Sequence, residues 1–125
     1  MNQGIAAVMA KYGLTSRDLR SDGRLTLAID GTYRVHLIAS NNGGMVIESR
    51  IRAMPEAPHE AERCMEESLR LAVSRMRDSA CTLALDREQR SLMLQQQVPA
   101  SASAREVEDL LGKFVNELAW WRKVA

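Results

Sequence analysis

Hydrophobic and polar positions alternate along the chain with two different periods, and each period predicts a different kind of element. Close to the start, four apolar residues fall at the spacing of one helix face: Ile5, Val8, Met9 and Tyr12. Residues 2–12 are therefore expected to form a short amphipathic helix that ends at Gly13. From Arg24 onward the period becomes two, which is typical of a strand with one buried face.

Three stretches with this period of two predict three half-buried strands: residues 24–29, 33–39 and 45–51. A two-residue turn after the first stretch would place apolar and charged residues on one face. We therefore expect a three-residue loop, which places Leu27 opposite Val35. A five-residue loop over residues 40–44 then places Leu37 opposite Ile47. The three stretches thus predict an antiparallel meander.

A long helix is predicted after the meander. Residues 54–58 end the third strand and start this helix, with proline at a position that a first helical turn tolerates, and the helix is expected to run to about Arg77. Its apolar stripe is wide: Ala61, Met65, Ser68, Leu69, Ala72, Val73 and Met76. One contact with a sheet does not require so wide a stripe. Because a two-fold contact between identical chains commonly covers such a surplus, the stripe predicts self-association.

The last third of the chain predicts a hairpin and a helix. Two alternating strands come first: residues 81–85 and 92–96. Their connection places Leu83 opposite Leu94. Ser103 and Glu106 then form a capping-box sequence, which marks the start of a helix. The apolar residues that follow at helical spacing are Val107, Leu110, Leu111, Phe114, Leu118 and Trp121.

The predicted order is α-β-β-β-α-β-β-α. Strands in runs with short connections favour an antiparallel, twisted sheet with helices packed on it, which is an α+β fold. A chain of 125 residues is expected to form a single domain over residues 1–125.

Charge and cysteine usage narrow the choice of compartment and partner. Seventeen basic and sixteen acidic residues give a formal net charge of +1, so no global field attracts nucleic acid or anionic membranes. The start of the chain lacks a basic segment followed by a long apolar run, which favours a cytoplasmic protein. Cys64 and Cys81 are then expected to be free thiols, although one disulfide remains an alternative. Seven methionines are compatible with a surface that adapts to varied partners or with ordinary core packing.

Candidate chemistry is sparse. The chain has no glycine-rich nucleotide loop and no G-x-S-x-G motif, so we expect neither an enzyme nor a cofactor. His36 lies on the polar side of a strand and His59 lies at a helix start, and neither has a nucleophile beside it in the pattern. Glu56 and His59 have the spacing of a carboxylate metal site, but Pro58 interrupts the turn and no second copy of the motif exists. No metal is expected.

The sheet face opposite the core gathers several cations by strand parity: Arg24, Arg34, His36, Arg50 and Arg52. One interpretation is a nucleic-acid site that uses Arg34 and Arg50. The patch carries no stacking aromatic residue and contains Glu48, which favours the second interpretation, a solvated sheet face.

Apolar residues on the same polar face support a third interpretation, a groove for a partner protein. Ile38 and Val46 lie there, and Met93 joins them if all strands form one sheet. At the other end of the chain, Trp120 and Trp121 are consecutive, so one helix cannot bury both on the same face. Trp120 or its neighbour is therefore available for a rim or a partner contact.

The order of elements resembles the class I type III secretion chaperones, the Tir chaperone (CesT) family. The resemblance spans nearly the whole chain and rests on a pattern of hydrophobic positions in several segments: GRLTL (23–27), YRVHL (33–37), IRAMP (51–55), TLALD (82–86), SLML (91–94) and LAWW (118–121). Family members are commonly acidic, and this chain departs from them in its near-neutral charge.

The resemblance implies a bacterial homodimer that binds the N-terminal region of a secreted effector and keeps it export-competent without ATP. The expected dimer interface is Met65, Leu69, Ala72, Val73 and Met76. The expected effector-binding residues are Ile5, Val8, Met9, Ile38, Val46, Met93 and Trp120. The secretion ATPase or a regulator is a further candidate partner. The alternatives are a dimeric regulatory module of a secretion system, such as an anti-activator or scaffold, and a small nucleic-acid-binding protein.

Overall fold

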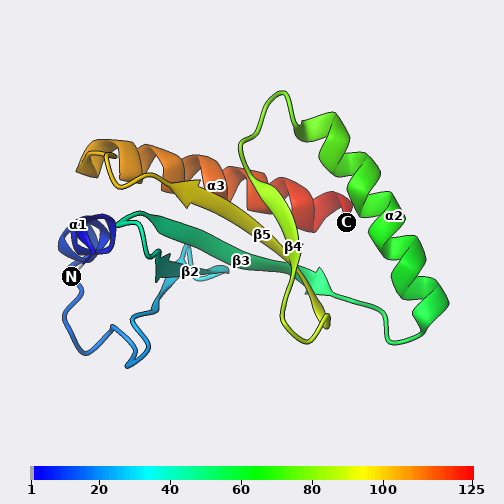
Figure 1. The fold of residues 1–125 in the computed structure, drawn as a ribbon, viewed down its shortest axis with the longest axis horizontal. Coiled ribbons are helices and arrows are strands. Elements are labelled where there is room, and N and C mark those ends of the chain that lie inside the picture. The colour runs from blue at the N-terminus through cyan, green and yellow to red at the C-terminus, as the bar shows by residue number, and fades with distance from the viewer. Residues whose placement is uncertain (1) are drawn as a thin grey trace.

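The structure, a computed structural model, describes residues 2–125 (Figure 1). Its elements follow the predicted order: α1 (Gln3–Tyr12), β1 (Leu25–Ile29), β2 (Tyr33–Ala39), β3 (Met45–Ala53), α2 (Pro58–Arg75), β4 (Thr82–Leu85), β5 (Ser91–Val98) and α3 (Ala104–Val124). The α+β fold class is confirmed. The expected boundaries differ by a few residues, and the largest difference on a strand is at β5, which continues to Val98.

The five strands form one antiparallel sheet in the order β1-β2-β3-β5-β4. Each register expected from the hydrophobic pattern is confirmed: Leu27 opposite Val35, Leu37 opposite Ile47 and Leu83 opposite Leu94. A shift of one residue would have moved each apolar set to the solvent side. The pairing of β3 with β5 joins the two groups of strands and brings Met93 onto the same face as Ile38 and Val46.

Short polar contacts define the helix ends. The Asn2 side chain accepts a hydrogen bond from the Ile5 amide and donates to the carbonyl oxygens of Gly43 and Gly44, so it ties the start of α1 to the β2–β3 loop. Gly13 ends α1 in the left-handed conformation, which favours glycine. The expected capping box at the start of α3, formed by Ser103 and Glu106, is confirmed.

Helices α1 and α3 pack on one face of the sheet and enclose the core (Figure 1). The largest fully buried side chains come from both helices and from the strands: Phe114, Ile5, Leu25, Leu37, Met45, Ile47, Leu92, Leu94, Leu118, Val8, Val35 and Val107. Each fully buried aliphatic or aromatic side chain contributes about 1.5–3 kcal/mol to folding relative to exposure. The other face of the sheet has no helix over it.

Helix α2 contributes little to this core, because only Met65, Leu71 and Ala72 of its residues, all half-buried, pack against it. It stands beyond the edge strand β4, which is the element it contacts most, and only Cys64 and Ser68 of its residues are buried (Figure 1). Three residues of the apolar stripe seen in the sequence, Leu69, Val73 and Met76, are exposed to solvent in the isolated chain, whereas Ala61, Met65 and Ala72 are half-buried.

Candidate partner-binding surfaces

The uncovered face of the sheet carries a row of polar side chains, one from each strand. Strand register aligns this row in the order Thr26, His36, Glu48, Gln95 and Thr82. Thr26 Oγ1 and His36 Nδ1 lie 2.9 Å apart in a hydrogen bond, and Gln95 Nε2 donates to Glu48 Oε2 at 2.7 Å. The row thus contains two hydrogen-bonded pairs of side chains.

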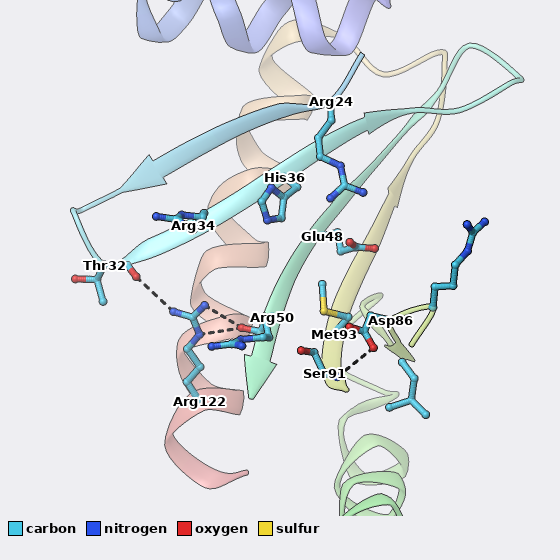
Figure 2. Close-up of a pocket in the computed structure, with 12 residues that line it drawn as sticks. Arg24, Thr32, Arg34, His36, Glu48, Arg50, Asp86, Ser91, Met93 and Arg122 are labelled. Carbon is cyan, nitrogen blue, oxygen red and sulfur yellow. Dashed lines mark hydrogen bonds between the residues drawn. The ribbon is translucent and has the colours of Figure 1, made fainter. Parts of the chain in front are cut away.

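Arginines surround this row and line an open hollow of about 800 Å³ (Figure 2). The residues that line the hollow are Arg24, Thr32, Arg34, His36, Glu48, Arg50, Leu85, Asp86, Arg87, Ser91, Met93 and Arg122. Two carboxylates therefore face five guanidinium groups. The sequence-based expectation that Arg24, Arg34 and Arg50 share one face is confirmed.

The positive potential of the hollow acts on His36. Burial lowers the pKa of the His36 imidazole below its ordinary value of 6.5, and the nearby charge of Arg24 lowers this pKa further. Glu48 opposes the shift because its negative charge favours the imidazolium. His36 is therefore mostly neutral at neutral pH.

Arg122, near the end of α3, connects the helix to β3 and to the loop between β1 and β2. Its Nε and Nη2 atoms donate to the Arg50 carbonyl oxygen at 3.1 and 2.9 Å, and its Nη1 donates to the Thr32 carbonyl oxygen at 3.4 Å (Figure 2). The regular pairing of β2 with β3 runs from His36 with Glu48 to Ala39 with Met45, so it does not extend to Arg50. Arg122 thus satisfies carbonyl groups that the ladder leaves unpaired.

A second surface lies on α2. Leu69, Val73 and Met76 follow one another at helical spacing, and their exposed fractions are 53%, 68% and 74%. Beside them, a smaller hollow of about 240 Å³ opens between α2, β4 and α3, with Leu83, Leu94 and Trp121 at its base. Exposed apolar residues in one stripe on a helix are typical of an interaction site.

One ion pair fastens the end of α2 to α3. The Arg75 guanidinium donates to both carboxylate oxygens of Glu117, and it also lies 4.5 Å from the centre of the Trp120 ring. This bidentate bond raises the pKa of Arg75. Trp120 packs edge-on against Trp121 with ring centres 5.2 Å apart. Trp120 is half-buried and Trp121 is buried.

The residues expected to bind partners lie in different environments. On α2, Met65 and Ala72 are half-buried, whereas the other three residues of the expected dimer interface are exposed. Ile38 and Val46 are half-buried on the uncovered face. Met93 lines the large hollow and is 9% exposed.

Ile5, Val8 and Met9 are buried in the core of the chain, where they pack with α3 and the sheet. An effector segment does not reach them in this conformation. The periodic pattern was the same for a core face and a binding face, so the sequence could not separate the two roles.

The sequence analysis did not predict two contacts, the ion pair of Arg75 with Glu117 and the hydrogen bonds of Arg122. Glu117 lies between Phe114 and Leu118 in the apolar stripe of α3, and a carboxylate in such a stripe is a signal for a buried partner. The partner itself, Arg75, is too distant along the chain to be identified from spacing. Arg122 carried no signal beyond its place in a last helical turn.

Other kinds of site find no support in residues 2–125. No cluster of three metal-ligating side chains occurs in this part of the chain, and none of its helices is long and apolar enough to cross a membrane. Cys64 and Cys81 are both free, as expected for a reduced protein.

Solved structures of similar shape come from type III secretion. One chain of the ExsC–ExsE complex superposes with a TM-score of 0.70 at 17% sequence identity, over 98% of this chain and 91% of that one. The chain from the complex of the Yersinia pestis secretion chaperone SycH with a fragment of YscM2 gives 0.66 at 17% identity, over 96% and 98%. A chain of the ExoU–SpcU complex of Pseudomonas aeruginosa gives 0.66 at 16% identity, over 92% of each. These similarities establish the fold.

No curated protein matches the chain significantly in sequence. The family model of the Tir chaperone protein family does match, and it covers residues 3–122. This span includes all five strands, α1, α2 and all of α3 except its last two residues. The chain therefore belongs to the Tir chaperone protein (CesT) family.

Proposed function

We propose that this protein is a type III secretion chaperone. It forms a homodimer in the bacterial cytoplasm, binds the N-terminal region of a secreted effector without ATP, and keeps that region competent for export. Membership of the Tir chaperone family supports this proposal. A chain of similar fold occurs in the HopA1–SchA complex, which is described as a chaperone–effector complex.

The proposal of a homodimer is based mainly on the exposed apolar stripe of α2. Leu69, Val73 and Met76 are the most exposed large hydrophobic side chains described in the chain. Packing two such helices around a two-fold axis removes both stripes from water, and each side chain buried in this way contributes about 1.5–3 kcal/mol. Helix α2 has few contacts of its own with the sheet, so its stripe is free for a partner.

The client is proposed to contact the uncovered sheet face and the end of α3. Ile38, Val46 and Met93 supply apolar contacts on the sheet, and Trp120 supplies a ring beside α2. An extended segment suits such a surface because alternate side chains point toward the sheet. Binding alone then prevents the segment from folding, so no nucleotide is needed.

Two measurements test this proposal. Light scattering coupled to gel filtration is expected to give a mass near twice 14.0 kDa, and a monomer at high protein concentration would contradict the dimer. Co-expression with the secreted proteins of the same bacterium, followed by affinity capture and mass spectrometry, is expected to retain a secreted protein. Deletion of the N-terminal region of the retained protein should abolish capture. Retention of a regulator in its place would favour the alternative of a regulatory module.

A further inference from the structure

Three arginines on the uncovered sheet face take part in no ion pair within residues 2–125. They are Arg24 before β1, Arg34 on β2 and Arg50 on β3, and we call them the arginine face (Figure 2). We propose that the arginine face binds an extended acidic segment of a partner protein. The identity of that partner as the client rests on the function proposed above, whereas the chemistry of the site rests on the observations that follow.

The first observation is the state of the charges. None of the ion pairs within residues 2–125 includes Arg24, Arg34 or Arg50. The two carboxylates that line the hollow are already engaged by neutral donors: Glu48 accepts from the Gln95 side chain, and Asp86 accepts from two backbone amides of its own turn. Asp22, which the charge of Arg24 also affects, accepts from the Arg24 backbone amide and pairs with Arg20. The guanidinium groups of the arginine face are therefore available for a carboxylate from outside.

The second observation is the sign of the field in the hollow. His36 lies at the centre of the arginine face, and Arg24, Arg34 and the more distant Arg20 all disfavour its protonation, in addition to burial. Glu48 is the one acidic group that favours protonation, and it does not reverse the shift. A region in which cations outweigh the anion at close range attracts negative side chains.

The third observation is geometric. Leu25 pairs with Leu37 and Ala28 pairs with Arg34, so Arg24 lies at one end of β1 and Arg34 lies across from the other end. Side chains on one side of an extended chain repeat every second residue, at about 6.6–6.8 Å. A peptide that runs along β1 and β2 can therefore direct carboxylates at positions i and i+4 to these two arginines. The intermediate position i+2 then lies over His36 and Thr26.

The composition of the hollow favours a peptide over nucleic acid. No Phe, Tyr or Trp side chain is among the residues that line it, and single-stranded nucleic acid is usually held by stacking on such rings. The nearest such ring, Tyr33, is covered by the Arg122 guanidinium at 5.4 Å from the ring centre. Glu48 inside the hollow also repels a continuous phosphate backbone. Met93 lines the hollow, and Ile38 and Val46 lie farther along β2 and β3 on the same face, so apolar contacts are available to a mixed acidic and apolar segment.

The test uses the purified full-length protein and a fluorescein-labelled peptide of alternating Glu and Val, with fluorescence anisotropy as the readout. We expect this peptide to bind at low salt and to bind more weakly at physiological salt. The double variant Arg34→Glu with Arg50→Glu should weaken binding by at least about tenfold, because the contact with Arg34 becomes repulsive and Arg50 no longer adds positive charge to the hollow. Both positions tolerate the change in the fold, since their own side chains are exposed.

The matched control is Arg105→Glu. Arg105 is exposed on α3, the helix that covers the opposite face of the sheet, so this variant alters the net charge without touching the arginine face. We expect its affinity for the acidic peptide to stay within about twofold of the unchanged protein. Circular dichroism melts and gel filtration establish that each variant keeps its fold and its oligomeric state.

Three results would overturn the proposal: equal binding of a peptide of alternating Lys and Val, tighter binding of single-stranded oligouridylate than of the acidic peptide, or full acidic-peptide affinity in the double variant. A change of oligomeric state in the double variant alone would assign the arginine face to a second copy of this chain, and would also overturn it. A failure here is distinguishable from failure of the chaperone proposal. If the double variant still captures the secreted protein as well as the unchanged chain does, the chaperone function stands and the acidic site falls.

Discussion

Arg75 on α2 donates two hydrogen bonds to Glu117 on α3, Nε to Oε1 at 2.9 Å and Nη2 to Oε2 at 2.6 Å. The Glu117 side chain is 8% exposed, so its carboxylate depends on this partner for compensation of its burial. Since α2 has few other contacts with the rest of the chain, this pair determines where the end of α2 lies.

Replacing Glu117 by Gln is expected to lower the melting temperature by about 3–6 °C, because a charged bidentate contact becomes at most one neutral hydrogen bond. Amide hydrogen exchange near the end of α2 should accelerate at the same time. The control is Glu108→Gln, which is also on α3. This change removes the exposed ion pair that Glu108 forms with Lys11 of α1. That variant should shift the melting temperature by less than about 2 °C. Equal effects of the two variants would contradict the role given to Glu117.

Replacing Arg122 by Gln removes a group that donates to the carbonyl oxygens of Thr32, in the loop between β1 and β2, and of Arg50 on β3. The free energy of unfolding, measured by urea denaturation, is expected to fall by about 1–2 kcal/mol. Arg122→Lys keeps the charge but cannot reach two carbonyl groups with a planar fork, so it should restore less than half of the loss. The neighbouring Lys123→Gln serves as the control for charge, and it should leave stability almost unchanged.

The double variant Leu69→Glu with Val73→Glu tests the α2 stripe. Two charges on each helix would be buried at the proposed two-fold contact without partners, so the protein is expected to elute as a monomer with its circular dichroism spectrum preserved. Val124→Glu alters an exposed apolar residue at the end of α3 and should leave the dimer intact. A dimer that persists in the double variant would place the interface elsewhere.

His36 predicts a pH dependence of stability. Its folded-state pKa is lowered below the ordinary value of 6.5, so the unfolded chain binds more protons than the folded chain in the window just below 6.5. Stability from this group is therefore present above pH 6.5 and is lost as the pH falls through the folded-state pKa. Melting temperatures measured between neutral and acidic pH should fall less steeply in His36→Asn than in the unchanged protein.

The cause of this shift has its own test. Replacing Arg24 by Gln removes the largest charge effect on His36, so the His36 pKa should rise toward 6.5. Titration of the imidazole by nuclear magnetic resonance measures the change directly. A His36 pKa at or above 6.5 in the unchanged protein would contradict the positive potential described for the hollow.

The strand registers were predictable from the chain because a period of two leaves little freedom. Leu27 can face Val35, and Leu37 can face Ile47, only if each loop has the length that keeps apolar residues together. Local signals were equally reliable at helix ends, as at Gly13 and Ser103, since a cap depends on residues a few positions away. The gathering of arginines on one sheet face followed from the same parity.

The sequence by itself therefore determined the order of elements, the pairing of strands within the meander and within the hairpin, and the lack of a recognisable catalytic motif, whereas the pairing of β3 with β5 came from the tertiary structure. Only the tertiary structure decided that the apolar face of α1 lies in the core while the stripe of α2 lies in solvent, because a helical period is identical in both settings. It also decided the contacts of Arg75 with Glu117 and of Arg122 with Arg50, which join residues 42 and 72 positions apart. Contacts at such separations depend on how whole elements pack, and no local pattern of residues records that packing.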